Sequence, residues 1–169
     1  MKDENYWQDY LLAKEGIYKD LMTKNYPNHL ISEANWVLRC QYGSGEEMGI
    51  EVSVGDICYI DYGQVYLNEM GYQHFGLVMA ISNRKAFVIP LTSNPVTYQK
   101  AYDPVENPRG KKNLMRIGLV DGLRKDSVLF LNDCRFINTA RVINITTHID
   151  PASDLFQEVE ARLKEVLRI

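Results

Sequence analysis

The chain has 169 residues, which is enough for one domain with a substantial core, or for one domain with a helical extension. Apolar residues make up 46% and charged residues 24% of the sequence, as is usual in globular proteins. The net charge of −3 excludes a global positive field that would attract nucleic acid, although a local basic patch can still bind one.

Cysteine usage and the N-terminus bear on the compartment. Cys40, Cys58 and Cys134 are widely spaced, odd in number and without a CxxC motif, which favours buried thiols in a reducing compartment over a disulfide framework. The charged N-terminus lacks the apolar core of a signal peptide, and no stretch approaches the length of a membrane span. We therefore expect a soluble, cytoplasmic protein that does not associate with membranes.

The first 42 residues are typical of two amphipathic helices. Between residues 5 and 24, apolar side chains share one helical stripe: Trp7, Tyr10, Leu11, Ile17, Tyr18, Leu21 and Met22. Residues 26–28 are expected to end this helix. A second helix is predicted from about 29 to 42, with one apolar side formed by Leu30, Ile31, Ala34, Val37 and Leu38. We expect a packed helical hairpin; the alternative use of its aromatic residues is nucleobase stacking.

Short strand patterns begin after a linker at residues 46–49. They fall at residues 54–62, 77–81, 86–91, 114–120, 127–131, 136–137 and 141–146. Asp150 and Pro151 are expected to cap and begin a final helix, whose apolar face is formed by Leu155, Phe156, Val159, Leu163, Val166 and Leu167. The predicted fold class is α+β, a small SH3-like antiparallel β-barrel with a C-terminal helix and an N-terminal helical hairpin extension. Residues 1–48 would form the extension and residues 49–169 the barrel domain.

The strands at 77–81 and 86–91 are predicted to form a hairpin around the turn at residues 82–85. If Ile81 pairs with Ala86, then Phe75 lies opposite Thr92 and His74 lies opposite Ser93. One imidazole and two hydroxyl groups would then meet at the open end of the hairpin. This group is either a place for chemistry or a satisfied polar rim.

Residues 94–113 contain three prolines and are predicted to be a long irregular segment, which is functional or disordered. Residues 96–125 contain three acidic and seven basic side chains, the basic ones being Lys100, Arg109, Lys111, Lys112, Arg116, Arg124 and Lys125. The local charge is thus +4 in a chain of −3. Such a segment is either a solvated loop or a contact surface for phosphate groups.

Several kinds of site are excluded by missing patterns. The three histidines are far apart, and no HExxH, HxH or CxxH occurs, so we expect no metal centre. No GxGxxG or Walker loop is present for a nucleotide cofactor, and no GxSxG for a serine nucleophile. We therefore predict no cofactor.

Three sequence blocks resemble MazF/PemK-type toxins. Residues 54–59, VGDICY, are similar to the opening strand of that family, and residues 88–93, VIPLTS, to its "V-V-P-L-T-S" strand end. Residues 125–131, KDSVLFL, with Asp133-x-Arg135-x-Ile137-Asn138, resemble the "K-D-S-V" run that leads into "Q-x-R-T-hydrophobic-D". The resemblance covers roughly residues 52–169 and leaves the N-terminal helices unmatched.

The resemblance implies a homodimeric endoribonuclease, the toxin of a toxin–antitoxin pair. Such enzymes cleave single-stranded RNA without metal, by attack of the 2′-hydroxyl on the adjacent phosphate. The implied partners are single-stranded RNA, a second copy and an antitoxin protein. Catalysis would fall to His74, Thr92, Ser93 and Arg135. RNA binding would fall to Gln73, Lys100, Arg109, Lys111, Lys112, Asn132 and Asp133.

The chemistry suits these residue types. A histidine can exchange a proton near neutral pH, hydroxyl groups can donate hydrogen bonds to a charged phosphate, and an arginine supplies fixed positive charge. The chain departs from the family where His74 replaces an arginine and Phe75 a proline. The additional helices either cap the barrel, extend the dimer or mask the RNA groove. The alternative function is a catalytically silent barrel that binds RNA or a protein.

Overall fold

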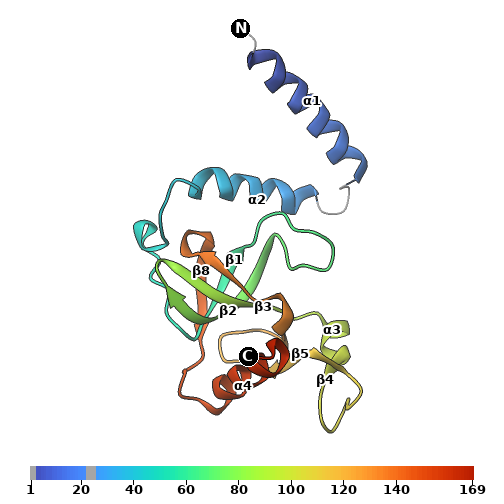
Figure 1. The fold of residues 1–169 in the computed structure, drawn as a ribbon, viewed down its shortest axis with the longest axis vertical. Coiled ribbons are helices and arrows are strands. Elements are labelled where there is room, and N and C mark those ends of the chain that lie inside the picture. Colours follow the sequence, from blue (N-terminus) through green and yellow to red (C-terminus); the bar gives the residue numbers. More distant parts are fainter. Residues whose placement is uncertain (1–2, 22–25) are drawn as a thin grey trace.

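The computed structural model describes residues 3–21 and 26–169. Its helices are α1 Asp3–Leu21, α2 Tyr26–Arg39, α3 Pro95–Lys100 and α4 Asp154–Leu167. Its strands are β1 Asp56–Asp61, β2 Gln73–Ser82, β3 Lys85–Thr92, β4 Ala101–Tyr102, β5 Lys111–Gly118, β6 Ser127–Phe130, β7 Arg135–Asn138 and β8 Val142–His148. Short 3₁₀ turns lie at Glu46–Met48, Leu131–Asp133 and Thr139–Arg141. Figure 1 shows α1 extending away from the body that the strands and α4 form.

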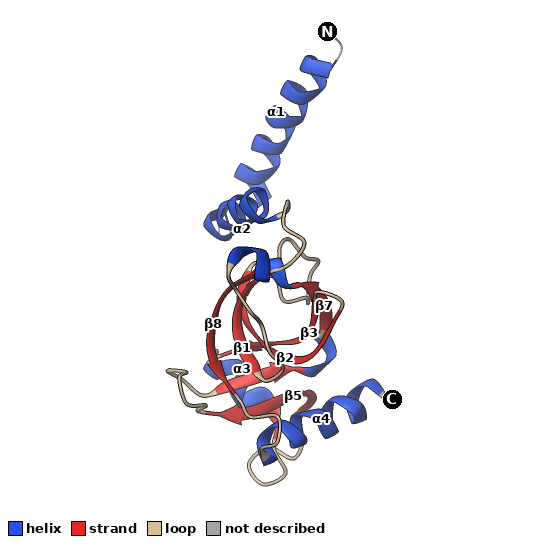
Figure 2. Ribbon diagram, turned by 90° about the vertical axis from the view of Figure 1, so that its left-hand side faces the viewer, coloured by secondary structure: helices blue, strands red, loops and turns tan. Residues whose placement is uncertain are grey.

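The described strands form one curled sheet. Its order is β4-β5-β6-β3-β2-β1-β8, and β7 pairs with β3 outside this path. All pairings are antiparallel except the short parallel contact between β4 and β5. Figure 2 shows the strands curling into a barrel-like ring with α4 at one end. This confirms the α+β fold class, with an antiparallel barrel and terminal helices.

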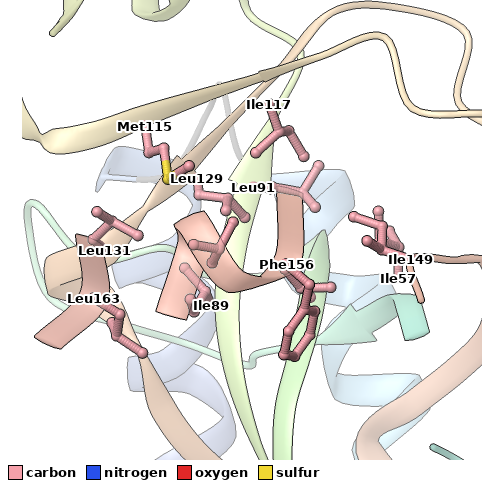
Figure 3. Packing of buried hydrophobic residues seen from close by; sticks show 12 residues of the cluster. Ile57, Ile89, Leu91, Met115, Ile117, Leu129, Leu131, Ile149, Phe156 and Leu163 are labelled. Carbon is pink, nitrogen blue, oxygen red and sulfur yellow. The ribbon is translucent and has the colours of Figure 1, made fainter. Parts of the chain in front are cut away.

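Buried apolar side chains lie on both faces of the sheet. On one face, Phe156, Val159 and Leu163 of α4 pack against residues such as Ile89 and Leu129 (Figure 3). On the other face, a second cluster gathers Cys58, Ile60, Tyr62, Val78, Ala86, Val88, Ile137 and Val142. Because α4 covers the first face, its predicted apolar stripe is confirmed.

The start of α4 differs from the expected one. Ser153 is the N-cap, and its Oγ accepts a hydrogen bond from the Phe156 backbone N–H at 3.3 Å. Asp150 instead closes the preceding turn, where its Oδ1 accepts from the N–H of Ala152 at 2.8 Å. Both residue types cap helices well, and the turn at Asp150 delays the helix by one turn.

The two N-terminal helices are present, but the predicted packed hairpin is wrong. Residues 26–28 begin α2 instead of ending α1, since proline is well tolerated in the first turn of a helix. Trp7 on α1 is 59% exposed and Val37 on α2 is 60% exposed, so neither packs into a shared core. The side chains of Leu21 and Met22 lie outside the described residues.

Contacts between the two helices are few and partly polar. Lys14 forms an ion pair with Glu33, and the ring centroids of Tyr18 and His29 lie 4.2 Å apart. The helices therefore meet near the end of α1 without a continuous apolar seam.

The proline-containing stretch 94–113 is ordered into short elements, so the expectation of an irregular segment is wrong. Asn94 caps α3, because its Oδ1 accepts hydrogen bonds from the N–H groups of Val96 and Thr97. The chain then continues as β4, and a bridge between Asp103 and Asn107 closes the next turn. Among the described helices, none is both long enough and apolar enough to cross a lipid bilayer.

Candidate active site

The central hairpin keeps the predicted turn but loses the predicted register. Ile81 pairs with Ala86 as expected. A β-bulge between Val78 and Ala80 then shifts the register by one residue, so Phe75 lies opposite Leu91 instead of Thr92. The predicted pairs of Phe75 with Thr92 and of His74 with Ser93 are therefore wrong.

The shifted register nevertheless favours the meeting of His74 and Thr92. They are the next residues beyond the last pair, one at the start of β2 and one at the end of β3. Since side chains alternate along a strand, both lie on the face opposite to Phe75 and Leu91. Both are half-buried, whereas Ser93 is exposed beyond the strand end.

His74 is oriented by a backbone carbonyl group. Its Nδ1 lies 2.6 Å from the carbonyl oxygen of Gly71. Because a carbonyl oxygen only accepts, Nδ1 carries the proton, and Nε2 of the neutral ring is left as a proton acceptor. Thr92 accepts a hydrogen bond at Oγ1 from the Asn94 N–H at 3.3 Å, so its own hydroxyl proton can be donated elsewhere.

Arg135 lies on the same face of the sheet as His74 and Thr92. It is opposite Val88, and its guanidinium carbon lies 5.6 Å from the centre of the Tyr62 ring. It also forms an ion pair with Asp133, whose other carboxylate oxygen accepts from the Met70 N–H. Arg135 is therefore a fixed cation whose charge is largely balanced.

Tyr62 is a site residue that sequence reasoning missed. It is buried, and its hydroxyl has no hydrogen-bond partner within the described part of the chain. Burial raises the pKa of this phenol above its ordinary value. The Tyr62 hydroxyl lies against Gly76 of β2, where it would be 2.2 Å from an added Cβ atom. Gly76 is the signal that could have found Tyr62, because a glycine inside an apolar strand often marks a close approach.

Asp61 is the second residue that sequence reasoning missed. It is buried at the end of β1 opposite Gln73. Its carboxylate accepts hydrogen bonds from Ser32 Oγ at 2.7 Å, Asn35 Nδ2 at 2.7 Å, Gln73 Nε2 at 3.0 Å and the Gly63 N–H at 2.9 Å. Burial acts to raise the pKa of Asp61, but these donors outweigh it and hold the pKa below its usual value. Through Ser32 and Asn35, these hydrogen bonds hold α2 against the barrel close to Gln73, the residue that precedes His74.

The basic residues form a separate group. Lys100, Arg109, Lys111 and Lys112 are exposed around α3, β4 and β5. Lys112 Nζ lies 5.7 Å from the centre of the Tyr102 ring.

Two further polar residues near this group, Arg116 and Asn132, are already paired. Arg116 forms ion pairs with Glu106 and Asp103, so its positive charge is already balanced by two carboxylates. Asn132 accepts at Oδ1 from Asn113 Nδ2 at 2.7 Å.

A cleft of about 590 Å³ lies between the N-terminal helices and the barrel. Tyr18, Trp36, Asp61 and Arg141 are among its lining residues. Over the ranges 3–21 and 26–169, His, Cys, Asp and Glu side chains form no group that could hold a metal ion.

The fold resembles that of several solved structures. The crystal structure of MazF (Form-I) from Deinococcus radiodurans is 16% identical and has a TM-score of 0.51, covering 70% of this chain and 97% of that chain. An endoribonuclease from Mycobacterial species is 11% identical, with a TM-score of 0.47 and coverage of 71% and 95%. MazE–MazF (Form-II) from Deinococcus radiodurans is 16% identical, with a TM-score of 0.46 and coverage of 70% and 96%. The sequence matches no protein-family model and no curated protein. The chain thus has a MazF-type fold.

Proposed function

We propose that this chain is the endoribonuclease toxin of a toxin–antitoxin pair and cleaves single-stranded RNA without a metal ion. The observation that carries the proposal is the imidazole of His74, oriented by the Gly71 carbonyl oxygen one residue beyond the last pair of β2 and β3 on a MazF-type fold. Its Nε2 is free to accept a proton, which is what activation of a ribose 2′-hydroxyl requires. The 19.5 kDa chain would act in the cytoplasm, with residues 49–169 as its catalytic domain and residues 1–48 as an extension.

The proposed reaction is a transesterification within the RNA. The 2′-oxygen attacks the adjacent phosphorus while its proton passes to Nε2 of His74, and the bond from phosphorus to the 5′-oxygen breaks. The 5′-oxygen leaves with a proton that the imidazolium returns, so the products are a 2′,3′-cyclic phosphate and a 5′-hydroxyl. Thr92 and Ser93 donate hydrogen bonds to the phosphate, and Arg135 contributes a fixed positive charge.

RNA binding is assigned to the basic group and to residues near the hairpin. Lys100, Arg109, Lys111 and Lys112 are exposed and would contact phosphates along the strand. Contacts closer to the reacting phosphate would come from Gln73, Asn132 and Asp133. We also propose an antitoxin protein as a partner, and a homodimer formed through the barrel.

Substitutions of two different histidines, one at the site and one as a control, test the catalytic assignment. His74→Ala should lower cleavage of a long mixed RNA by about 10²–10⁴-fold, which is the usual effect of losing a general acid–base group. Thr92→Ala should lower it by up to about 10²–10³-fold. His148→Ala is the matched control, since His148 is half-exposed and paired with Asp56 away from the hairpin end. EDTA should leave the parent rate unchanged, and a DNA analogue should resist cleavage.

Parent-like activity in folded His74→Ala protein would overturn the assignment of His74.

A second function, a silent barrel that binds RNA or a protein, is favoured by one observation. Gln73 already donates to Asp61, and Arg135 is already paired with Asp133, so each would have to share or give up a partner before it contacts a reacting phosphate. RNA binding by a parent protein that never cleaves would select this function.

A further inference from the structure

The orientation of α2 is the reverse of what its pattern leads one to expect. An amphipathic helix usually buries its apolar stripe against the body of the protein. Here the side turned to the barrel is polar: His29 and Ser32 are buried, and Asn35 is half-buried. The opposite side, which we term the outward face, is formed by Leu30, Ile31, Ala34, Val37 and Leu38.

The polar side of α2 is fixed in place by Asp61. Ser32 and Asn35 donate to its carboxylate, and Arg39 Nη1 donates to the carbonyl oxygens of Val142 at 2.9 Å and Ala140 at 3.3 Å. Turning the outward face inward would break these bonds and bury Leu and Ile where the barrel offers hydrogen-bonding groups. The outward face is therefore directed away from the body by the fold itself.

The exposed apolar area is large for a monomer. Leu30 and Leu38 mark the extremes of the outward face, at 47% and 66% exposed, with Ile31 and Val37 between these values. The neighbouring helix α1 exposes further large apolar side chains, namely Tyr6, Trp7, Tyr10, Leu11, Leu12 and Ile17. The two helices together expose ten such side chains, roughly 1,000 Å². The outward face of α2 holds four of them, and the six on α1 include Tyr10, which lines the cleft toward the barrel. A stable interface needs about 800 Å² from each partner.

We propose that α2 pairs through its outward face with the same face of a second copy of this chain, flanked by α1 from each copy. A two-fold interface sets identical residues near one another, so a charged face would repel itself. The outward face carries no charged residue, and the nearest charges are already engaged, Glu33 with Lys14 and Arg39 with carbonyl oxygens. Two copies of this face can therefore meet without charge repulsion.

The surface does not suit an anionic membrane. Membrane-surface helices carry Lys and Arg on their polar side, whereas the sequence of α1 has five acidic and two basic residues, a net charge of −3. The proposed pairing goes beyond the proposed catalytic function and does not depend on it. It also differs from a dimer formed through the barrel, because it uses only the N-terminal helices.

The test is the mass of the full-length protein in solution, measured by light scattering at tens of micromolar. The parent should form a species of twice the 19.5 kDa chain or a multiple of it. Leu38→Glu should halve that mass and weaken self-association at least about 30-fold, as expected for a buried anchor of an interface. Leu119→Glu is the matched control, since Leu119 is 63% exposed on the connection after β5.

Circular dichroism checks that the variants fold, and Leu38→Gln repeats the test without adding charge. A parent that remains at 19.5 kDa overturns the proposal. Equal masses for the parent, Leu38→Glu and Leu38→Gln overturn it as well, because the assembly would then lie elsewhere. The proposal is supported if the Leu38 variants have a lower mass than the parent while Leu119→Glu keeps the parent's mass.

Discussion

The hydroxyl group of Tyr62 occupies the space that a side chain on residue 76 would need. A Cβ atom added to Gly76 would lie 2.2 Å from Tyr62 Oη and 2.9 Å from Ile60 Cδ1. The ring is buried, so it has little freedom to move aside. This contact joins the end of β1 to β2 on the face that carries His74.

Gly76→Ala should lower the free energy of unfolding by about 1–3 kcal/mol, because overpacking a buried site forces neighbours out of place. Tyr62→Phe should be near neutral, since the hydroxyl it removes has no partner among the described residues. The double variant should recover part of the loss, because the ring carbon Cζ lies at an ordinary 3.5 Å from that Cβ position. Denaturant titrations of all four proteins measure the coupling, and strictly additive effects would refute this contact.

Asp61→Asn should destabilise the protein by about 1–3 kcal/mol at neutral pH, because the amide cannot accept all the hydrogen bonds of the carboxylate. The pKa of Asp61 is lowered in the folded state. Its contribution is therefore present above the unfolded pKa of about 4 and is lost as the pH falls through the folded value. The difference between parent and variant should thus narrow on acidification. Thermal melts from neutral to acidic pH check this, with exposed Asp126→Asn as control, and a difference independent of pH would contradict it.

Replacing Arg109, Lys111 and Lys112 together by alanine should weaken RNA binding and flatten its salt dependence. Each lost phosphate contact to a single strand lowers the slope by about 0.7, so the slope should fall by about 2. Fluorescence anisotropy at several salt concentrations measures it. Lys85→Ala, an exposed cation at the start of β3, should leave the slope unchanged. A triple variant with the parent's affinity and slope would mean that these side chains are only solvated.

Ser153→Ala should cost about 1 kcal/mol of unfolding free energy, because it removes the cap of α4. Asp150→Ala should cost less, since Asp150 bonds within the preceding turn only. Chemical denaturation compares the two, and a larger loss for Asp150→Ala would restore the cap position expected from the sequence.

Local patterns predicted the elements well and their long-range contacts poorly. The Ile81–Ala86 pair follows from the polar turn between two apolar runs. The bulge that moves Phe75 opposite Leu91 has no marker, because the residues from Val78 to Ala80 include no glycine or proline. A one-residue insertion of this kind depends on how the sheet must curl, which a single strand does not encode.

The same limit applies to the candidate site and to α2. The pattern of α2 correctly gave a helix with one apolar side, but not the direction of that side. The direction follows from Asp61, a carboxylate far along the chain that Ser32 and Asn35 satisfy. His74 was recognisable as a polar residue at a strand end, whereas its bond to Gly71 depends on the path of the loop before it.

The polar contact between α2 and the barrel has a consequence for the local stability of this helix. Separation of this helix from the barrel would expose mainly hydroxyl, amide and carboxylate groups, which water solvates readily, so it forfeits little hydrophobic free energy. Segments with few buried apolar contacts open far more often than a protein's core strands. The amide hydrogens of α2 should therefore exchange with solvent before those of β2. Each such opening would take the Ser32 and Asn35 donors away from Asp61 and leave Gln73, next to His74, as the side-chain donor that stays on this carboxylate.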